Sequence, residues 1–336
     1  AVPPELRGGY RGFWRAADVL EFTSHGYDGY VFDEHMQKRE FKGYRVDCIT
    51  DFGLEFLDQV QKDKPFFLTI SHIEPHHQND RHCYEGPAGS KTRFQDFVLP
   101  ADLQALPGNA AEMYPDYLGC CRSLDDNLGR VVDKLKAMGI WENTILIFAS
   151  DHGSHFMTRN RDAHLNGYDD YKRSCHDACL HVPLVICGPG FEGGKRISEL
   201  VSTASLPKTI LAMASIDVGD QMIGENLQTV VDGKIQNRPN RIFAQISESR
   251  VGRCIRTADY LYSVYAPGVH GGEVMDSDLY EDDFLYDLKA DPAQLHNCVA
   301  DPRYQKIKED LRAQLIEEMI QAHEKKPVIR DGKIEA

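Results

Sequence analysis

The sequence has no long hydrophobic run and little positive charge. Nowhere do about 18 apolar residues follow one another, which excludes a membrane-spanning helix. The chain has 38 Lys and Arg against 52 Asp and Glu, a formal net charge of −14. Nucleic-acid binding needs clustered Lys and Arg that neutralise phosphates, so the composition argues against a nucleic-acid partner. An acidic surface also repels anions, so an anionic substrate requires local positive charge or a metal.

The sequence also lacks a cysteine pair of the zinc-binding type. None of its nine cysteines forms a Cys-x-x-Cys motif. At 336 residues, of which 42% are apolar, the chain can bury a large core without disulfides. We therefore expect most cysteines to be reduced and buried, a usage that favours either a reducing compartment such as the cytoplasm or an anaerobic setting.

The most informative segment is an apolar run that ends in metal-binding residue types. Residues 145–149 have the pattern of a buried strand, and Asp151, His152 and Gly153 follow it. In open α/β sheets, ligands bind just beyond the carboxyl ends of the strands. A carboxylate oxygen suits calcium or magnesium, and an imidazole nitrogen also admits manganese or zinc. We therefore predict that Asp151 and His152 are metal ligands.

Two further segments place imidazole and cationic side chains near apolar runs. Residues 65–71 form a second buried-strand pattern, which is followed by His76 and His77. Lys172 precedes a third apolar run over 182–187, in a segment that is crowded with charge. The sequence thus predicts that two strand ends deliver His and acidic residues toward one edge of a sheet.

The order of the predicted elements indicates an α/β fold. The spacing of apolar residues predicts helices over 47–62, 115–138, 206–214 and 302–324. Helices that alternate with strands indicate a mostly parallel central sheet flanked by helices. From residue 241 onward, short alternating runs predict an antiparallel sheet that packs on the closing helix. We expect an α/β domain over 1–240 and a small α+β subdomain over 241–336.

Several motifs occur together in an order that resembles the sulfatase family of the alkaline-phosphatase superfamily. The matching pieces are Pro75-His76, the helix around 124–129, Ser150-Asp151-His152-Gly153, Val182-Pro183-Leu184 with Gly188-Pro189-Gly190, and Tyr286-Asp287-Leu288. They span nearly the whole chain. The resemblance implies an alkaline-phosphatase-like fold and the hydrolysis of aryl or carbohydrate sulfate esters. It also implies a divalent metal, usually calcium, with magnesium, manganese or zinc as the alternatives.

The resemblance assigns roles to residues beyond the metal pair. Lys172 matches the lysine that contacts the sulfate, where an ammonium neutralises charge in the transition state. His76 matches the histidine that serves as hydrogen-bond donor or general acid to the leaving group. We expect His76, Asp151, His152 and Lys172 to converge at one end of one sheet, within about 10 Å of each other.

Three neighbours are candidates for substrate binding. His77 could replace His76, and Arg173 is the rival of Lys172 as the cation at the sulfate. His176 could contact the substrate, or it could be a buried histidine whose ring nitrogens are satisfied by the protein. The sequence leaves each of these alternatives open.

The family's nucleophile is missing from the sequence. Sulfatases convert a Cys or Ser, in the motif Cys/Ser-x-Pro-x-Arg, to formylglycine, and no such pentapeptide occurs here. The strand whose Asp-Asp pair supplies two more metal ligands is also missing. Since the chain begins at Ala1 with neither an initiator Met nor a signal peptide, we expect it to lack an N-terminal segment that carries these parts. The chain alone should then be inactive.

Two other functions remain open from the sequence. The first is hydrolysis of phosphate or phosphonate esters within the same superfamily, which an Asp-His metal pair would suit. The second is a non-catalytic homologue that has lost its nucleophile. The terminal Tyr286-Asp287-Leu288 segment and Glu74-Pro75-His76 favour the sulfatase.

Overall fold

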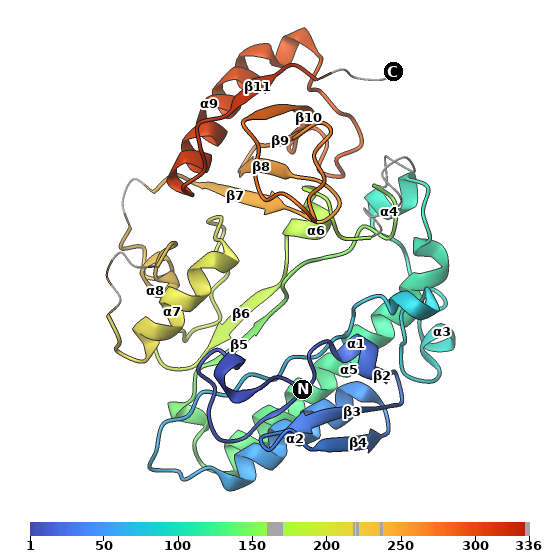
Figure 1. Cartoon of the computed structure of the whole chain (residues 1–336), viewed down its shortest axis with the longest axis vertical. Coiled ribbons are helices and arrows are strands. Elements are labelled where there is room, and N and C mark those ends of the chain that lie inside the picture. The colour runs from blue at the N-terminus through green and yellow to red at the C-terminus, as the bar shows by residue number, and fades with distance from the viewer. Residues whose placement is uncertain (160–170, 218, 220–221, 236–237, 333–336) are drawn as a thin grey trace. The chain divides into compact units, whose positions relative to one another are not determined.

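The computed structural model describes residues 1–159, 171–217, 219, 222–235 and 238–332. It divides into two compact units, which Figure 1 follows from blue at the N-terminus to red at the C-terminus. The first unit consists of Ala1–Leu99 with Ala110–Thr144, and the second of Pro100–Asn109 with Ile145–Ala336.

The first unit is built on two long helices that pack against each other. These are α2 (Arg45–Gln59) and α5 (Ala110–Ala137), and they confirm the helices that the apolar spacing predicts. Asn127 of α5 donates a hydrogen bond to Asp47 of α2 at 2.7 Å. The remaining elements of this unit are η1 (Pro4–Leu6), β1 (Arg15–Ala16), α1 (Leu20–Thr23), β2 (Ser24–His25), β3 (Asp28–Asp33), β4 (Lys38–Lys42), η2 (Asn79–Arg81), α3 (Ser90–Arg93) and η3 (Trp141–Asn143). Strand β3 pairs antiparallel with β1, β2 and β4.

The prediction of a buried strand over 65–71 is wrong. This segment has no regular secondary structure, and the Phe67 side chain is 60% exposed. A strand needs a neighbour to satisfy its backbone N–H and C=O groups, and no described strand pairs with this segment. An apolar sequence pattern therefore did not suffice to form a strand here.

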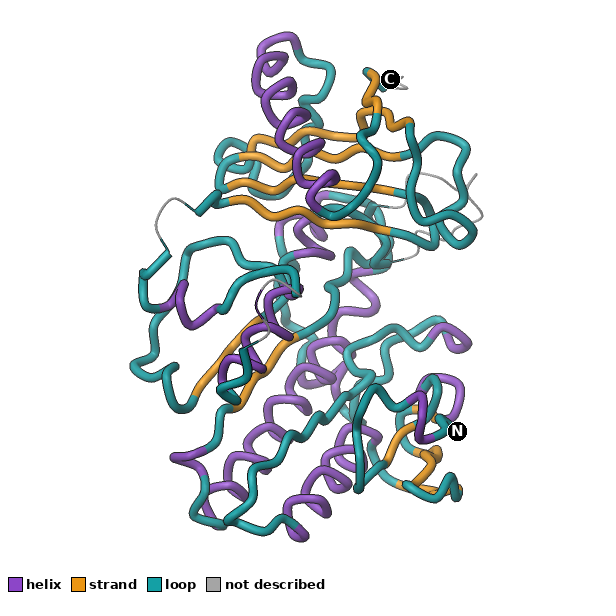
Figure 2. Tube along the Cα trace, turned by 60° about the vertical axis from the view of Figure 1, so that its left-hand side comes forward, coloured by secondary structure: helices purple, strands orange, loops and turns teal. Residues whose placement is uncertain are grey.

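The second unit contains a five-stranded sheet near the C-terminus. Its strand order is β11-β10-β9-β8-β7, with β10 and β11 parallel and the other neighbours antiparallel. The strands are β7 (Arg241–Ile246), β8 (Gly252–Thr257), β9 (Tyr260–Tyr265), β10 (Leu279–Asp287) and β11 (Val328–Arg330). Figure 2 shows helix α9 (Gln305–Gln321) crossing these strands on one face. The predicted antiparallel sheet with a closing helix is confirmed, apart from the parallel edge strand.

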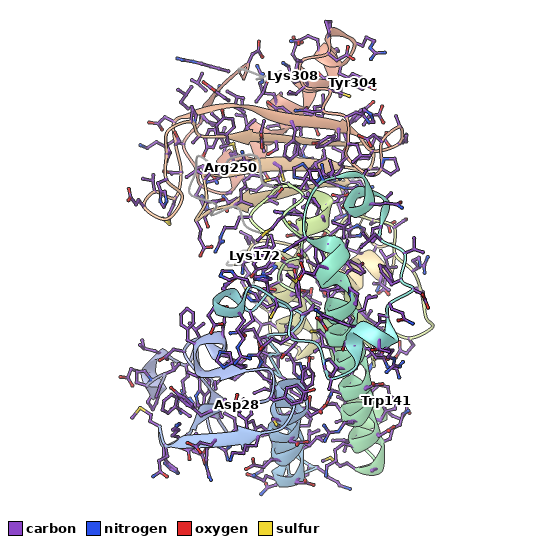
Figure 3. The ribbon with its side chains drawn as sticks, turned by 90° about the vertical axis from the view of Figure 1, so that its right-hand side faces the viewer. Asp28, Trp141, Lys172, Arg250, Tyr304 and Lys308 are labelled. Carbon is purple, nitrogen blue, oxygen red and sulfur yellow. The ribbon has the colours of Figure 1, made fainter. Side chains whose placement is uncertain are left out.

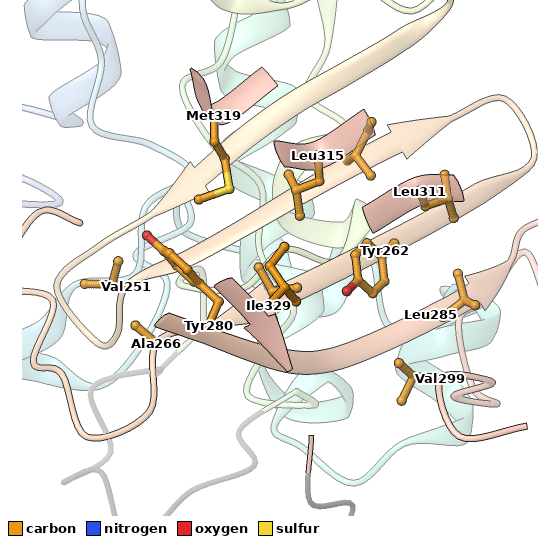
Figure 4. Packing of buried hydrophobic residues seen from close by; sticks show 12 residues of the cluster. Val251, Tyr262, Ala266, Tyr280, Leu285, Val299, Leu311, Leu315, Met319 and Ile329 are labelled. Atoms are coloured by element: carbon orange, nitrogen blue, oxygen red, sulfur yellow. The ribbon is translucent and has the colours of Figure 1, made fainter. Parts of the chain in front are cut away.

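A hydrophobic core joins this sheet to its helix. Leu311, Leu315 and Met319 of α9 are buried against Tyr262 of β9 and Leu285 of β10, as Figure 4 shows. Side chains on one stripe of the helix meet alternate residues of the strands, which is how the two periodicities bury a common face. This packing fixes the position of strands β8 and β10, which contact the segment that carries Lys172 and His176.

The strand pair next to the predicted metal ligands is antiparallel. Strand β5 (Leu146–Ala149) pairs with β6 (Leu184–Cys187), so the mostly parallel sheet that we expected is not formed by the described residues. Antiparallel neighbours need no crossover helix, and the eight-residue helix α7 (Leu206–Met213) follows both strands in the chain. The α/β class itself is confirmed. The other elements of this unit are α4 (Ala101–Ala105), α6 (Asp177–Leu180), η5 (Thr203–Ser205), α8 (Leu227–Val231) and η7 (Pro302–Tyr304).

The cysteines are reduced, as the composition predicts. All nine cysteines are free thiols, and Cys120, Cys175, Cys179 and Cys254 are buried. Burial raises the pKa of the Cys121 thiol to about 11, so it is protonated at neutral pH. Within the described part of the chain, no helix combines the length and apolar character that crossing a membrane requires.

Candidate functional site

The loop after β5 holds His152 in one tautomer. Its Nδ1 lies 2.9 Å from the carbonyl oxygen of Gly153. Because a carbonyl oxygen only accepts hydrogen bonds, Nδ1 must carry the hydrogen. In the neutral ring the lone pair is then on Nε2, which is the form in which an imidazole binds a metal. The backbone of the loop thus holds His152 in the tautomer that a metal ligand requires.

Asp151 presents a carboxylate oxygen on the same side as this nitrogen. Its Oδ2 lies 3.8 Å from His152 Nε2, while its Oδ1 accepts a hydrogen bond from the His152 backbone N–H at 2.9 Å. A cation about 2.3 Å from both atoms would fit between them. The described residues contain no group of three or more His, Cys, Asp or Glu side chains that could hold a metal ion. The pair therefore fits a divalent cation as part of a ligand set.

Gly153 lets this loop approach helix α6 closely. Its backbone N–H donates to the Cys179 carbonyl oxygen at 2.8 Å. A Cβ atom at Gly153 would overlap the carbonyl oxygen of Ala178. A glycine is therefore needed at this position for steric reasons.

Lys172 and Arg173 have different surroundings, although they are adjacent in the sequence. Lys172, labelled in Figure 3, is half-buried, and its Nζ lies 5.5 Å from the centre of the Tyr171 ring. Tyr171 is buried, and its carbonyl oxygen accepts a hydrogen bond from the His155 N–H at 2.7 Å. The guanidinium of Arg173 forms an ion pair with the carboxylate of Glu248. Arg173 is thus held by an acidic partner from a distant part of the chain.

His176 is buried between its own loop and the C-terminal sheet. Its Nδ1 is hydrogen-bonded to the Ser174 hydroxyl, and its Nε2 lies 3.2 Å from the Tyr286 hydroxyl of β10. The ring also packs 4.3 Å from the centre of the Phe284 ring. Of the two roles that the sequence leaves open, these contacts support a structural one, in which His176 anchors the segment that carries Lys172.

His76 and His77 lie in the first unit, in the turn that follows the irregular segment 65–71. The Nδ1 of His76 lies 2.6 Å from the His77 carbonyl oxygen, so this ring too carries its hydrogen on Nδ1. His77 is 3% exposed, and its ring packs edge-on against Tyr84 with 5.4 Å between the ring centres. His76 is half-buried, which leaves it more accessible than His77.

Two buried side chains and one half-buried side chain near this turn were missed by sequence reasoning. The side chains of Arg45 and Glu74 are each 1% exposed and form an ion pair, with Nε 2.8 Å from Oε1. His72 shares a hydrogen bond with the Thr50 hydroxyl at 2.9 Å, and burial lowers its pKa to about 4. Their only signal in the sequence is the residue type, because no periodicity distinguishes a buried Arg or His from an exposed one.

Comparison with known families places these residues in context. The family model for sulfatases matches residues 7–216. A second model, described as the C-terminal part of N-sulphoglucosamine sulphohydrolase, matches residues 166–321. The first match contains every residue to which the sequence assigns a role.

Individual relatives have low sequence identity to this chain, but their matches cover nearly all of it. An ulvan-active sulfatase of Formosa agariphila is 23% identical over 338 residues, which cover 94% of this chain and 59% of the relative. A putative sulfatase from Bacteroides fragilis superposes with a TM-score of 0.76 at 19% identity, covering 96% of this chain and 68% of that one. BT4656, solved with its substrate D-glucosamine-2-N,6-O-disulfate, has a TM-score of 0.68 at 18% identity and coverages of 97% and 79%. The chain thus spans 59% of the length of the ulvan-active sulfatase.

Proposed function

The chain belongs to the sulfatase family, and on this premise we propose that it carries part of a metal-dependent site that hydrolyses carbohydrate sulfate esters. The observation that carries the proposal is the paired orientation of Asp151 Oδ2 and His152 Nε2, which lie 3.8 Å apart. They would hold a divalent cation, which in this family is usually calcium. When bound, that cation supplies charge that polarises the sulfate group.

Lys172 is proposed as the cation that neutralises a sulfate oxygen. The reaction places negative charge on the sulfate oxygens, and a compact ammonium stabilises that charge. Arg173, whose guanidinium is paired with Glu248, is the rival candidate for this role. The contacts of His176 with Ser174 and Tyr286 support a role in holding Lys172 in place, and direct substrate binding by His176 is the alternative.

His76 is proposed to assist the departure of the alcohol. With its hydrogen on Nδ1, the neutral ring has only a lone pair at Nε2, so it can donate a proton from Nε2 only as the imidazolium. As the ester C–O–S linkage breaks at the O–S bond, the leaving oxygen would take that proton. The burial of His77 supports His76 over its neighbour for this role.

The nucleophile is proposed to be a formylglycine that lies outside the given sequence. The chain contains no Cys/Ser-x-Pro-x-Arg pentapeptide. Hydrolysis through a covalent intermediate needs such a group.

We further propose a domain boundary near residue 240, since the sheet of β7–β11 and helix α9 share their own core.

The proposed function is tested by measuring product release from a panel of esters. The protein is produced from the complete gene, in a host that generates formylglycine, and is given sulfated glucosamines, an aryl sulfate, a phosphate monoester and a phosphonate ester. We expect sulfate release from a sulfated glucosamine, the compound class that BT4656 binds. Asp151→Ala serves as the inactive control. Faster release of phosphate or phosphonate would support the other hydrolase class, and binding without any turnover would support a non-catalytic homologue.

A further inference from the structure

A buried charged network lies directly beneath the turn that carries His76. Arg45, the first residue of α2, is 1% exposed and donates from Nε to Glu74 Oε1 at 2.8 Å. Its Nη1 donates to the Ser24 carbonyl oxygen at 3.2 Å and to Gln78 Oε1 at 3.3 Å. Glu74 precedes His76 by two positions, and Gln78 follows it by two. One guanidinium therefore binds both ends of the turn.

Regular secondary structure does not hold this turn. Residues 65–77 belong to no helix or strand, and the turn has two backbone hydrogen bonds, from the His76 N–H to the Ile73 carbonyl oxygen at 2.8 Å and from the Gln78 N–H to the Cys83 carbonyl oxygen at 2.7 Å. The side chain of Gln78 adds a hydrogen bond from Nε2 to Asp80 at 2.7 Å, and Glu21 accepts one from the Asn79 N–H at 2.6 Å. Side-chain contacts, with Arg45 at their centre, thus add to these backbone hydrogen bonds in holding the turn.

The burial of this ion pair carries a cost that points to a specific role. Burial raises the pKa of the Glu74 carboxyl above its usual value, although the Arg45 guanidinium acts in the opposite direction. Glu74 Oε2 has no hydrogen-bond partner among the described residues. A buried ion pair is often no more stabilising than apolar residues of the same volume, so its benefit here lies in fixing geometry.

We propose that Arg45 and Glu74 are positioning residues that orient the His76 imidazole for its role in sulfate ester hydrolysis. By fixing residues 74 and 78, they set the direction of the His77 carbonyl, which accepts the Nδ1–H of His76 at 2.6 Å. That contact determines which ring nitrogen carries the hydrogen and where Nε2 points. The inference rests on the proposed function of His76, and neither Arg45 nor Glu74 touches the substrate.

The test compares two variants with a matched control. Arg45→Lys keeps the charge but removes the planar fork, and Glu74→Gln keeps the shape but removes the ion pair. Arg15→Lys is the control, because Arg15 is another buried arginine of the same unit, paired with Glu34 and Glu55. The 336-residue chain is used for nitrogen NMR of the His76 imidazole, and the protein from the complete gene for kinetics on a sulfated glucosamine.

We expect both variants to shift the His76 nitrogen signals away from the Nδ1–H tautomer. In the enzyme, kcat should fall about 10- to 100-fold with little change in KM, because a small misplacement of a catalytic group has that effect. The control should change neither readout. If Arg45→Lys does not fold, the milder Glu74→Gln still decides the matter.

Unchanged His76 signals and unchanged kcat in a folded Glu74→Gln variant would overturn the proposal. The NMR readout separates it from the proposed function. If His76→Ala retains full kcat while Glu74→Gln still shifts the tautomer, then Arg45 and Glu74 do orient His76, but the catalytic role of His76 is wrong. If His76→Ala abolishes kcat and Glu74→Gln changes nothing, the positioning role of Arg45 and Glu74 is wrong and the proposed function stands.

Discussion

The Nδ1–H of His152 donates to the carbonyl oxygen of Gly153 at 2.9 Å, which directs the ring's lone pair to Nε2. This single contact fixes the tautomer of a histidine at a strand end and leaves the lone pair on the nitrogen that we propose as a metal ligand. Asp151 Oδ2 lies 3.8 Å from that nitrogen. The backbone of one short loop therefore accounts for the spacing of the two proposed ligands and for the tautomer of His152.

Replacing Asp151 should abolish metal retention. Asp151→Ala removes the oxygen that faces His152 Nε2, so the protein from the complete gene should lose its divalent metal and its turnover together. Metal content measured by elemental analysis, alongside sulfate release, checks this. Asp276→Ala removes an exposed carboxylate elsewhere in the second unit and should change neither quantity. Full metal content in Asp151→Ala would exclude this residue as a ligand.

Gly153→Ala should weaken metal binding without unfolding the protein as a whole. The new Cβ would overlap the Ala178 carbonyl oxygen, so the loop must move away from α6. We expect a lower metal affinity by titration calorimetry and a lower melting temperature. Gly129→Ala is the control, since Gly129 lies in helix α5 with open space at its Cβ position. That change should stabilise by up to about 1 kcal/mol. Equal metal affinity in the two variants would argue against the steric role of Gly153.

His72 should make stability depend on pH in the mildly acidic range. Burial lowers its pKa from 6.5 to about 4, so the folded state favours the neutral ring. The folded protein keeps its full stability above pH 6.5 and loses stability as the pH falls toward 4, by an amount on the order of 3 kcal/mol. Denaturant unfolding of the wild type and His72→Gln at several pH values measures it. In the His72→Gln variant the free energy of unfolding should depend less steeply on pH. In the exposed control His35→Gln it should depend on pH as in the wild type.

The given chain by itself should not hydrolyse sulfate esters above background. It contains no formylglycine motif, and its described residues contain no cluster of three or more metal-binding side chains. We expect weak divalent metal binding and no turnover of aryl or carbohydrate sulfates. An assay of sulfate release by the purified 336-residue chain checks this. Robust turnover would show that another nucleophile lies within these residues.

The parts of the fold that the sequence predicts are those with local causes. The apolar stripe that predicts a helix over 115–138 reappears in α5 (Ala110–Ala137), and the closing helix reappears as α9 (Gln305–Gln321). Helices form their hydrogen bonds internally, so their pattern is legible in one segment. Segment 65–71 shows the contrast, since its apolar pattern is that of a strand but a strand depends on a partner elsewhere in the chain.

The candidate site likewise contains residues that could be predicted from the sequence and contacts that could not. Asp151 and His152 could be proposed from their place after a strand, and the structure adds the tautomer and the 3.8 Å spacing that make them a usable pair. The partner of Arg173 could not be predicted, because Glu248 lies far away in the sequence. Likewise, the burial of His176 between Ser174 and Tyr286 is a tertiary property that leaves no local pattern.

The turnover of a Lys172→Ala variant tests the account most directly. The measurement is kcat for sulfate release from a sulfated glucosamine by the protein from the complete gene, with metal content determined on the same sample. We predict that kcat falls about 10²- to 10³-fold while the metal stays bound, because the ammonium stabilises charge only in the transition state. Arg173→Ala should retain kcat near the wild-type value. Normal turnover in Lys172→Ala, with the loss found in Arg173→Ala instead, would contradict the account.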